Sequence, residues 1–183
     1  DGGMITTPNE EYYKQLKKYV WFGVDREDKK TTPIDPLPEE IDILGFKYNM
    51  NDITATIGLV GLKHLDEALA RRKEIGDRYR RDLVNCSKVK LVYIPPENVV
   101  NFQIFPVHVQ NRSKFADFMR ERGIFINVNN RRNDRYKIFG GLREDLPSLA
   151  KADEDTILIP LHCDLSDADV EKIISSIKEF DAR

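Results

Sequence analysis

LGFKYNMNDI, residues 44–53, is the stretch in which a loop gives way to the longest helix that this sequence predicts. Asn51 suits the start of a helix, because its side-chain oxygen can accept a hydrogen bond from a free backbone amide of the first turn. Apolar residues then recur along one drifting stripe, which predicts a helix from about Asp52 to Leu83. Gly58 and Gly61 lie inside it, and each costs about 1 kcal/mol relative to alanine. We therefore expect a tightly packed neighbour beside them, with a second subunit as one candidate.

Upstream of this stretch, the sequence predicts a short strand, a helix and a long loop. Met4–Thr6 has the composition of a strand. Thr7 then has the position of a cap for a helix at about Pro8–Val20, with Glu10 at its third position. Residues 24–40 are charged and rich in proline, so they are expected to form a loop.

Downstream, strands and helices alternate and predict a small α+β lobe. The last helix is expected to open with a capping box made by Ser166 and Asp169. The expected strands are Lys90–Ile94, Asn101–Val109, Ile124–Val128 and Thr156–Ile159, and a helix is expected at Ser113–Arg122.

Composition limits the possible classes of protein. The 183 residues include 29 basic and 31 acidic side chains that are well mixed along the chain, so neither a nucleic-acid-binding face nor a membrane-binding run is expected. Cys86 and Cys163 lie far apart, and we interpret both as free thiols rather than as a disulfide or part of a zinc site. The chain starts Asp1-Gly2-Gly3-Met4 without a signal-peptide pattern. We expect a cytoplasmic protein, and a fragment of a longer one.

Several segments, in order along the chain, resemble motifs of one family, the DegT-type sugar aminotransferases of the type I pyridoxal-phosphate (PLP) fold. Residues 44–53 resemble the family's G-Y-K-Y-N-M-T-D-I motif. The other matching segments are DGGMITT (1–7), WFGVDR (21–26), LKHLDEALARR (62–72), IPLH (159–162) and LSDADV (165–170). The resemblance implies an α/β fold with three parts: the tail of the PLP-binding large domain (1–50), a connecting helix (51–85) and a C-terminal α+β small domain (86–183).

The same resemblance implies an enzyme that uses PLP to transfer an amino group, from glutamate, to a keto group on a nucleotide-linked sugar. Family members are homodimers whose active sites are shared between subunits. In the family, the lysine that anchors the cofactor lies a few residues before the segment that matches Asp1–Thr7, and the aspartate at the pyridine nitrogen lies earlier still. We therefore expect this chain to be inactive alone, because PLP chemistry needs both groups.

Lys47 and Asn49 are the cofactor-binding candidates that the resemblance implies. The family's matching loop reaches the phosphate end of the PLP in the partner subunit. The Asn49 amide can donate a hydrogen bond to a phosphate, and Lys47 adds a cation beside a dianionic group. The N-terminus of the following helix would add its dipole. From the residues alone, Asn49 is more readily explained as a cap of that helix.

A polar run from Asn127 to Asp134 is the second candidate site. Much of the family has an H-Y-x-x-x-H pattern here, which this chain replaces with an R-N-D element found in a subset of the family. Arginine suits a diphosphate or a carboxylate, because a guanidinium binds oxygens in pairs. From composition alone, the basic run Arg131–Arg135 is a solvated loop. The substrate-binding candidates are Asn129, Asn130, Arg131, Arg132 and Asp134.

Two other functions fit the sequence. The chain could be a stand-alone, non-catalytic small domain that serves in protein interaction, which predicts a stable fold that needs no other half. Alternatively, it could belong to a sugar dehydratase relative that uses PLP or its amine form, PMP, without a lysine anchor. The residue that separates the aminotransferase from the dehydratase lies upstream of Asp1.

Overall fold

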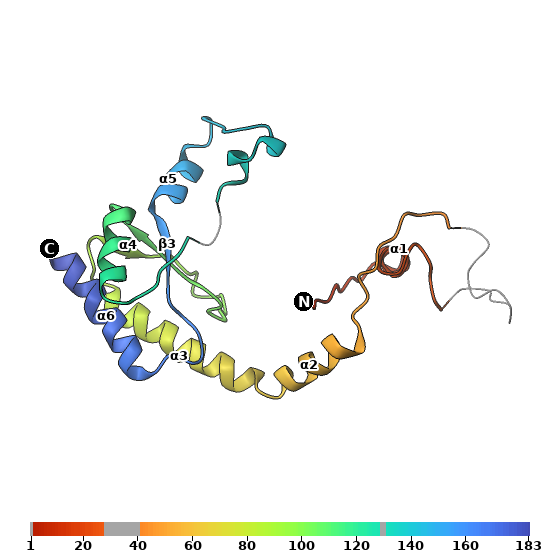
Figure 1. Cartoon of the computed structure of the whole chain (residues 1–183), viewed down its shortest axis with the longest axis horizontal. Helices are drawn as coiled ribbons and strands as arrows, with labels where there is room; N and C mark the ends of the chain where they lie inside the picture. Colours follow the sequence, from red (N-terminus) through yellow and green to blue (C-terminus); the bar gives the residue numbers. More distant parts are fainter. Residues whose placement is uncertain (1, 28–40, 129–130) are drawn as a thin grey trace. The chain divides into compact units, whose positions relative to one another are not determined.

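The structure, a computed structural model, describes residues 2–27, 41–128 and 131–183. Its contacts divide the chain into two compact units, Asp1–His64 and Leu65–Arg183, which we call the first and second units (Figure 1). The first unit is helix and loop, and the second combines helices with a small antiparallel sheet. The α/β fold class that the sequence predicts, with an α+β lobe at its C-terminal end, is confirmed.

The first unit begins with helix α1, Glu10–Val20, which starts later than expected. Its cap is Asn9 and not Thr7: the Asn9 side chain accepts a first-turn backbone N–H at 3.1 Å, whereas Thr7 Oγ1 accepts the backbone N–H of Asn9. Asparagine is the stronger cap of the two residue types. The strand expected at Met4–Thr6 is not formed, because no described segment pairs with its backbone. Most of the expected proline-rich loop, residues 28–40, lies outside the described residues.

A second segment of the first unit runs antiparallel to the end of α1. Three backbone hydrogen bonds of 2.8 to 2.9 Å join residues 19–22 to residues 46–48. The two segments approach so closely that a Cβ on Gly45 would lie 1.9 Å from the backbone nitrogen of Gly23. Only glycine fits at residue 45, and the loop that carries Lys47 is therefore held against the end of α1.

The helix expected as one piece over residues 51–85 is two helices, α2 (Asp52–Leu62) and α3 (Leu65–Leu83). At Lys63 and His64, between them, the backbone N–H groups bond to carbonyls three residues back, which ends the α-helical pattern. The single helix was wrong because α2 is apolar on all sides, whereas α3 is amphipathic and buries one face, so the apolar stripe does not continue through both. The domain boundaries expected at residues 50 and 85 stay a prediction.

The sheet of the second unit has three antiparallel strands in the order β1-β2-β3. They are β1 (Val89–Leu91), β2 (Phe105–Val109) and β3 (Thr156–Ile159). The bounds of β3 are those that the sequence predicts. The two earlier strands are shorter than expected, and Phe102, with a φ of 48°, interrupts the extended backbone before β2. The strand expected at Ile124–Val128 is reduced to one bridge, between Asn127 and Leu158.

Helices cover one face of this sheet. Alternate residues of β2, Phe105, Val107 and Val109, are buried in a core with α3, α4 (Arg112–Glu121) and α6 (Asp167–Ala182). The largest fully buried side chains of this core are Tyr79, Phe115, Ile75, Leu83, Met119, Ile174 and Ile177. The capping box at the start of α6 is confirmed, with the Ser166 and Asp169 side chains each accepting the other's backbone N–H.

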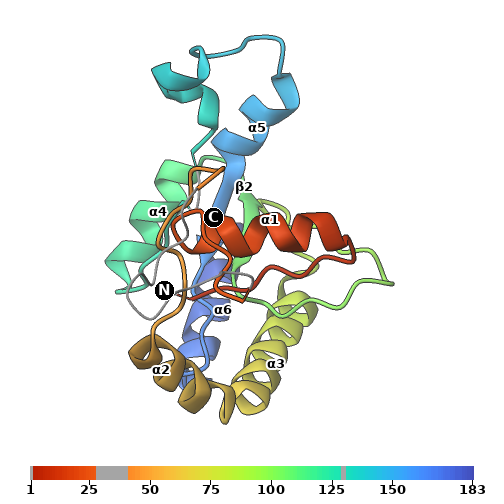
Figure 2. The same ribbon diagram turned by 90° about the vertical axis from the view of Figure 1, so that its right-hand side faces the viewer.

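The elements between α4 and β3 position the candidate site of the second unit. Two short 3₁₀ turns, η1 (Asn133–Arg135) and η2 (Lys137–Phe139), precede α5 (Pro147–Asp155), which leads directly into β3 (Figure 2). The sequence reasoning did not anticipate any of the three. Among the helices of the described ranges, none has the length and hydropathy needed to cross a membrane.

Candidate functional site

The first candidate site is the loop that carries Lys47 and Asn49. Lys47 pairs with Trp21 as an antiparallel bridge through its backbone, and its side chain is exposed. Among the described residues, no carboxylate forms an ion pair with Lys47. The ammonium group is therefore free to meet an anion.

Asn49 is half-buried, and it is not the residue that caps α2. Asn51 caps α2, because its Oδ1 accepts the backbone N–H of Thr54 at 2.9 Å. The Oδ1 atom of Asn49 is buried and has no hydrogen-bond partner among the described residues. Buried polar atoms in folded proteins nearly always have partners, so this amide has binding capacity left for a group other than the described residues.

These residues fit a phosphate group. An amide can turn so that its NH₂ takes the place of its oxygen, which makes Asn49 a donor toward an anion. Lys47, two residues earlier, supplies the cation. The carboxylate of Asp52 lies in the first turn of α2 and offsets the helix dipole there, so the amide and the ammonium group are the main contributors.

The second candidate site is a pocket of about 720 Å³ in the second unit, which we call the arginine pocket. The pocket is bounded by the start of α4, by Asn127, which bridges to β3, by η1, and by the last turn of α5. Three guanidinium groups and one carboxylate line it. Its lining residues are Arg112, Asn127, Val128, Arg131, Asn133, Arg135, Tyr136 and Asp153.

The three arginines of the pocket differ in their partners. Arg135 donates two hydrogen bonds, of 3.1 and 2.7 Å, to one carboxylate oxygen of Asp153. Arg112 donates to the backbone carbonyls of Asp153 and Thr156. Arg131 is exposed, and it forms no hydrogen bond or ion pair with any described residue. Arg131 is thus the arginine of this pocket that has no described partner.

Arg132 and Asp134 do not line the pocket; they pair with each other and are 7% and 8% exposed. Arg132 Nε donates to Asp134 at 2.8 Å and the same guanidinium donates to the carbonyl of Arg143 at 2.9 Å. The backbone N–H of Arg143 donates to Asp134 at 3.0 Å. The Arg132 hydrogen bond and this amide lower the pKa of Asp134 to about 2. The pair and its two hydrogen bonds with the Arg143 backbone therefore join the two ends of the loop from residue 134 to residue 143.

The expected substrate residues thus have different surroundings. Arg131 lines a pocket, Arg132 and Asp134 form an internal pair, and Asn129 and Asn130 lie outside the described residues. Asn127 and Arg135 belong to the runs that the sequence analysis singled out, and both line the pocket. Sequence reasoning missed Arg112 and Asp153, because nothing in the sequence brings either residue to this loop.

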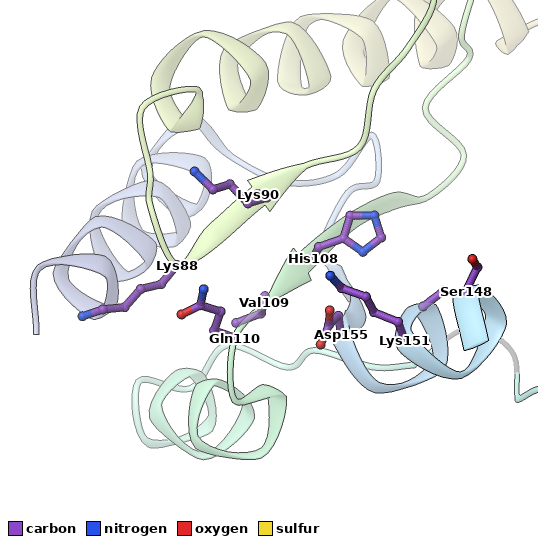
Figure 3. A pocket seen from close by; sticks show the side chains of 9 residues that line it. Lys88, Lys90, His108, Val109, Gln110, Ser148, Lys151 and Asp155 are labelled. Carbon is purple, nitrogen blue, oxygen red and sulfur yellow. The ribbon is translucent and has the colours of Figure 1, made fainter.

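Another pocket, of about 440 Å³, lies beside β1, β2 and α5 (Figure 3). Lys90, His108 and Lys151 line it, but Lys90 Nζ donates to the carbonyl of Cys86 at 3.1 Å, and His108 Nδ1 lies 3.2 Å from Thr156 Oγ1. Figure 3 shows Lys88 extending away from His108. Lys90 and His108 thus already contact other groups of the chain, whereas the arginine pocket holds a guanidinium without a described partner and is the better candidate for an anionic substrate.

Comparison with known proteins gives a consistent result. The family model described as DegT/DnrJ/EryC1/StrS aminotransferase family matches residues 1–178. The chain is similar to the sugar aminotransferase CalS13 from Micromonospora echinospora (26% identity, TM-score 0.85), with 94% of this chain and 46% of that one covered.

Two further solved structures are similar. The aminotransferase TlmJ from Streptoalloteichus hindustanus has 25% identity and a TM-score of 0.78, with 94% of this chain and 45% of that one covered. The PMP form of Spr1654 from Streptococcus pneumoniae has 26% identity and a TM-score of 0.79, with 97% and 45% covered. The chain thus spans a little under half the length of the solved proteins that it matches.

Proposed function

The chain belongs to the DegT/DnrJ/EryC1/StrS aminotransferase family, and on this premise we propose that it is the C-terminal portion of a PLP-dependent enzyme. The complete enzyme transfers an amino group, from glutamate, to a keto group on a nucleotide-linked sugar. The observation that carries the proposal is the buried Asn49 amide, which has an unsatisfied oxygen in a loop where the family places a phosphate contact.

PLP, when bound, supplies the electron sink that amino transfer needs. Lys47 and Asn49 hold the phosphate end of that cofactor, the former as a cation and the latter as a hydrogen-bond donor. The lysine that anchors PLP and the carboxylate at its ring nitrogen lie outside residues 1–183. This chain alone therefore transfers no amino group, and its contribution is binding and positioning.

The arginine pocket takes the diphosphate of the nucleotide-linked sugar. Arg131 has no described partner, and its guanidinium can bind two phosphate oxygens at once. Arg132 and Asp134 act indirectly, because their buried pair fixes the loop that carries Arg131. Asn129 and Asn130, next to Arg131 in the sequence, are the remaining residues of this proposed site.

The enzyme is a homodimer in which α2 is covered by other protein. The large side chains of α2 are apolar and more than half exposed within this chain, which supports a covering surface elsewhere in the assembly. Gly58 and Gly61 have no described atom within 4 Å of an added Cβ. The close neighbour expected at these glycines is not among the described residues, and we propose that the rest of the dimer supplies it.

Isotope transfer tests the reaction itself. The complete enzyme that contains this chain is incubated with ¹⁵N-glutamate and a nucleotide-linked keto sugar, and the sugar product is analysed by mass spectrometry. The proposal predicts ¹⁵N in the sugar. Loss of the hydroxyl group without label in the sugar would instead indicate the dehydratase.

Kinetics of an Arg131→Gln variant test the substrate site. Loss of a guanidinium that binds the diphosphate equally in the ground and transition states raises KM for the nucleotide-linked sugar about tenfold and leaves kcat unchanged. Arg120→Gln is the matched control, because Arg120 lies on α4 of the same unit, is exposed, and has Asp117 as its one ion-pair partner among the described residues. An unchanged KM for Arg131→Gln would exclude Arg131 from the substrate site.

A further inference from the structure

Asp153 connects the parts of the arginine pocket, although it lies in α5, away from the basic run in sequence. Only 8% of its side chain is exposed. Its Oδ2 atom accepts both hydrogen bonds from Arg135, and its Oδ1 atom accepts the backbone N–H of Arg132 at 3.4 Å. One carboxylate therefore holds the side chain of Arg135 and the peptide group that directly follows Arg131.

The backbone of Asp153 is itself fixed. Asp153 lies in the last turn of α5, where carbonyl groups have no partner within the helix. Arg112, the first residue of α4, donates to the carbonyl of Asp153 and, at 3.2 Å, to that of Thr156, where β3 begins. The backbone that carries the carboxylate is thus fixed where α5 meets β3, by hydrogen bonds from the first residue of α4.

Opposing effects act on the ionisation of this carboxylate. Burial raises the pKa of Asp153, but the hydrogen bonds from Arg135 and from the Arg132 amide, with the nearby charges of Arg135 and Arg112, outweigh it. The pKa of Asp153 consequently lies below its ordinary value. The group is ionised at neutral pH and can hold a guanidinium permanently.

We propose that Asp153 is a positioning residue of the arginine pocket: it orders Arg135 and the backbone beside Arg131 so that both guanidiniums meet a diphosphate without further rearrangement. This inference rests on the proposed function, in which the pocket takes the diphosphate of a nucleotide-linked sugar. Ordering before binding favours affinity, because a side chain that is already fixed loses no conformational freedom when the ligand arrives.

Charge and positioning make opposite predictions for Asp153. The pocket carries three arginines and one carboxylate. If Asp153 acted only through its charge, its removal would make the pocket more positive and anion binding tighter. If Asp153 acts by positioning, its removal releases Arg135 and the Arg132 peptide, and anion binding becomes weaker. The sign of the change in affinity therefore distinguishes the two roles.

The experiment compares the binding of inorganic pyrophosphate to the 183-residue chain and to its Asp153→Asn variant by titration calorimetry at one fixed ionic strength. Asparagine keeps the shape and removes the charge. The expected result is affinity about tenfold weaker, the effect of one displaced charge-assisted contact. Glu154→Gln is the matched control, because it removes the neighbouring carboxylate, which is exposed and lines no part of the pocket, and its affinity should equal that of the unsubstituted chain.

Unchanged or tighter pyrophosphate binding by Asp153→Asn would overturn the positioning role while leaving the substrate site in place. Absence of binding by the unsubstituted chain would instead remove the proposed substrate site, and the positioning role with it.

A measurement on the unsubstituted chain covers the case in which Asp153→Asn does not fold. Nitrogen relaxation of the arginine Nε–H groups should show Arg135 ordered before pyrophosphate is added, and Arg131 ordered only afterwards. An Arg135 side chain that is mobile in the free chain would overturn the proposal.

Discussion

Substituting Asn49 by aspartate should detach the cofactor from the complete enzyme. Aspartate has nearly the shape of asparagine, so the half-buried position accepts it, and no described hydrogen bond of the Asn49 side-chain oxygen is lost, because it makes none. The substitution replaces the NH₂ donor with an acceptor and places a negative charge toward a phosphate dianion. The binding free energy therefore changes through two effects of the same sign.

The magnitude follows from these two effects. A hydrogen bond to a charged group contributes about 1.5–3 kcal/mol. Repulsion between the new carboxylate and the phosphate adds to this, although solvent at a half-exposed site screens much of it. A total of about 3 kcal/mol weakens PLP retention by about 100-fold.

The assay is equilibrium dialysis of the holoenzyme at about pH 8, where a carboxylate is ionised, with absorbance of the released PLP as the measurement. Asn51→Asp is the matched control. It makes the same change of charge two residues away, and aspartate caps α2 as well as asparagine does. If Asn49→Asp retained PLP as well as Asn51→Asp, the phosphate role of Asn49 would be refuted.

Three further predictions concern the second unit. Ser166→Ala removes half of the capping box of α6 and should lower the free energy of unfolding by about 1 kcal/mol in a urea titration, whereas Ser166→Thr should change it little. Gly76→Ala places a Cβ 2.6 Å from the ring of Phe102 and should cost about 1–3 kcal/mol in the same titration; an unchanged midpoint would contradict the close approach. The pKa of Asp134 is lowered to about 2, so its pair with Arg132 stabilises the fold above about pH 4 and loses that effect as the pH falls toward 2. Tm should therefore fall less between these pH values in Asp134→Asn than in the unsubstituted chain, and parallel curves would count against the pair.

Local patterns in the sequence were sufficient where local contacts decide the structure. The capping box at Ser166 and the bounds of β3 depend on residues within a few positions, and both were predicted. The cap of α1 was not, because Thr7 and Asn9 are both capping residues and only the backbone geometry at Asn9 distinguishes them. The turn at Lys63 was missed because apolar residues continue at helical spacing on both sides of it. That spacing does not show where one helix ends and the next, which buries one face, begins.

The candidate sites follow the same division. Lys47 and Asn49 were found because a continuous motif contains them, and the helix cap predicted at Asn51 is confirmed. The sequence could not show that the Asn49 oxygen is buried without a described partner. In the arginine pocket, the sequence identified Arg131 but grouped it with Arg132 and Asp134. Those two residues form a buried ion pair, and the sequence does not show which charged residues are buried. Asp153 could not be found from the sequence, since it joins the loop only through the packing of α5.

The most direct test of the central claim is to locate the lysine that carries PLP. The native enzyme that contains this chain is treated with borohydride, which fixes the cofactor to its lysine, and its peptides are analysed by mass spectrometry after denaturation. The account predicts a PLP-modified lysine in a segment outside residues 1–183, in the same polypeptide or in a companion. A PLP adduct on any lysine within residues 1–183 would contradict it.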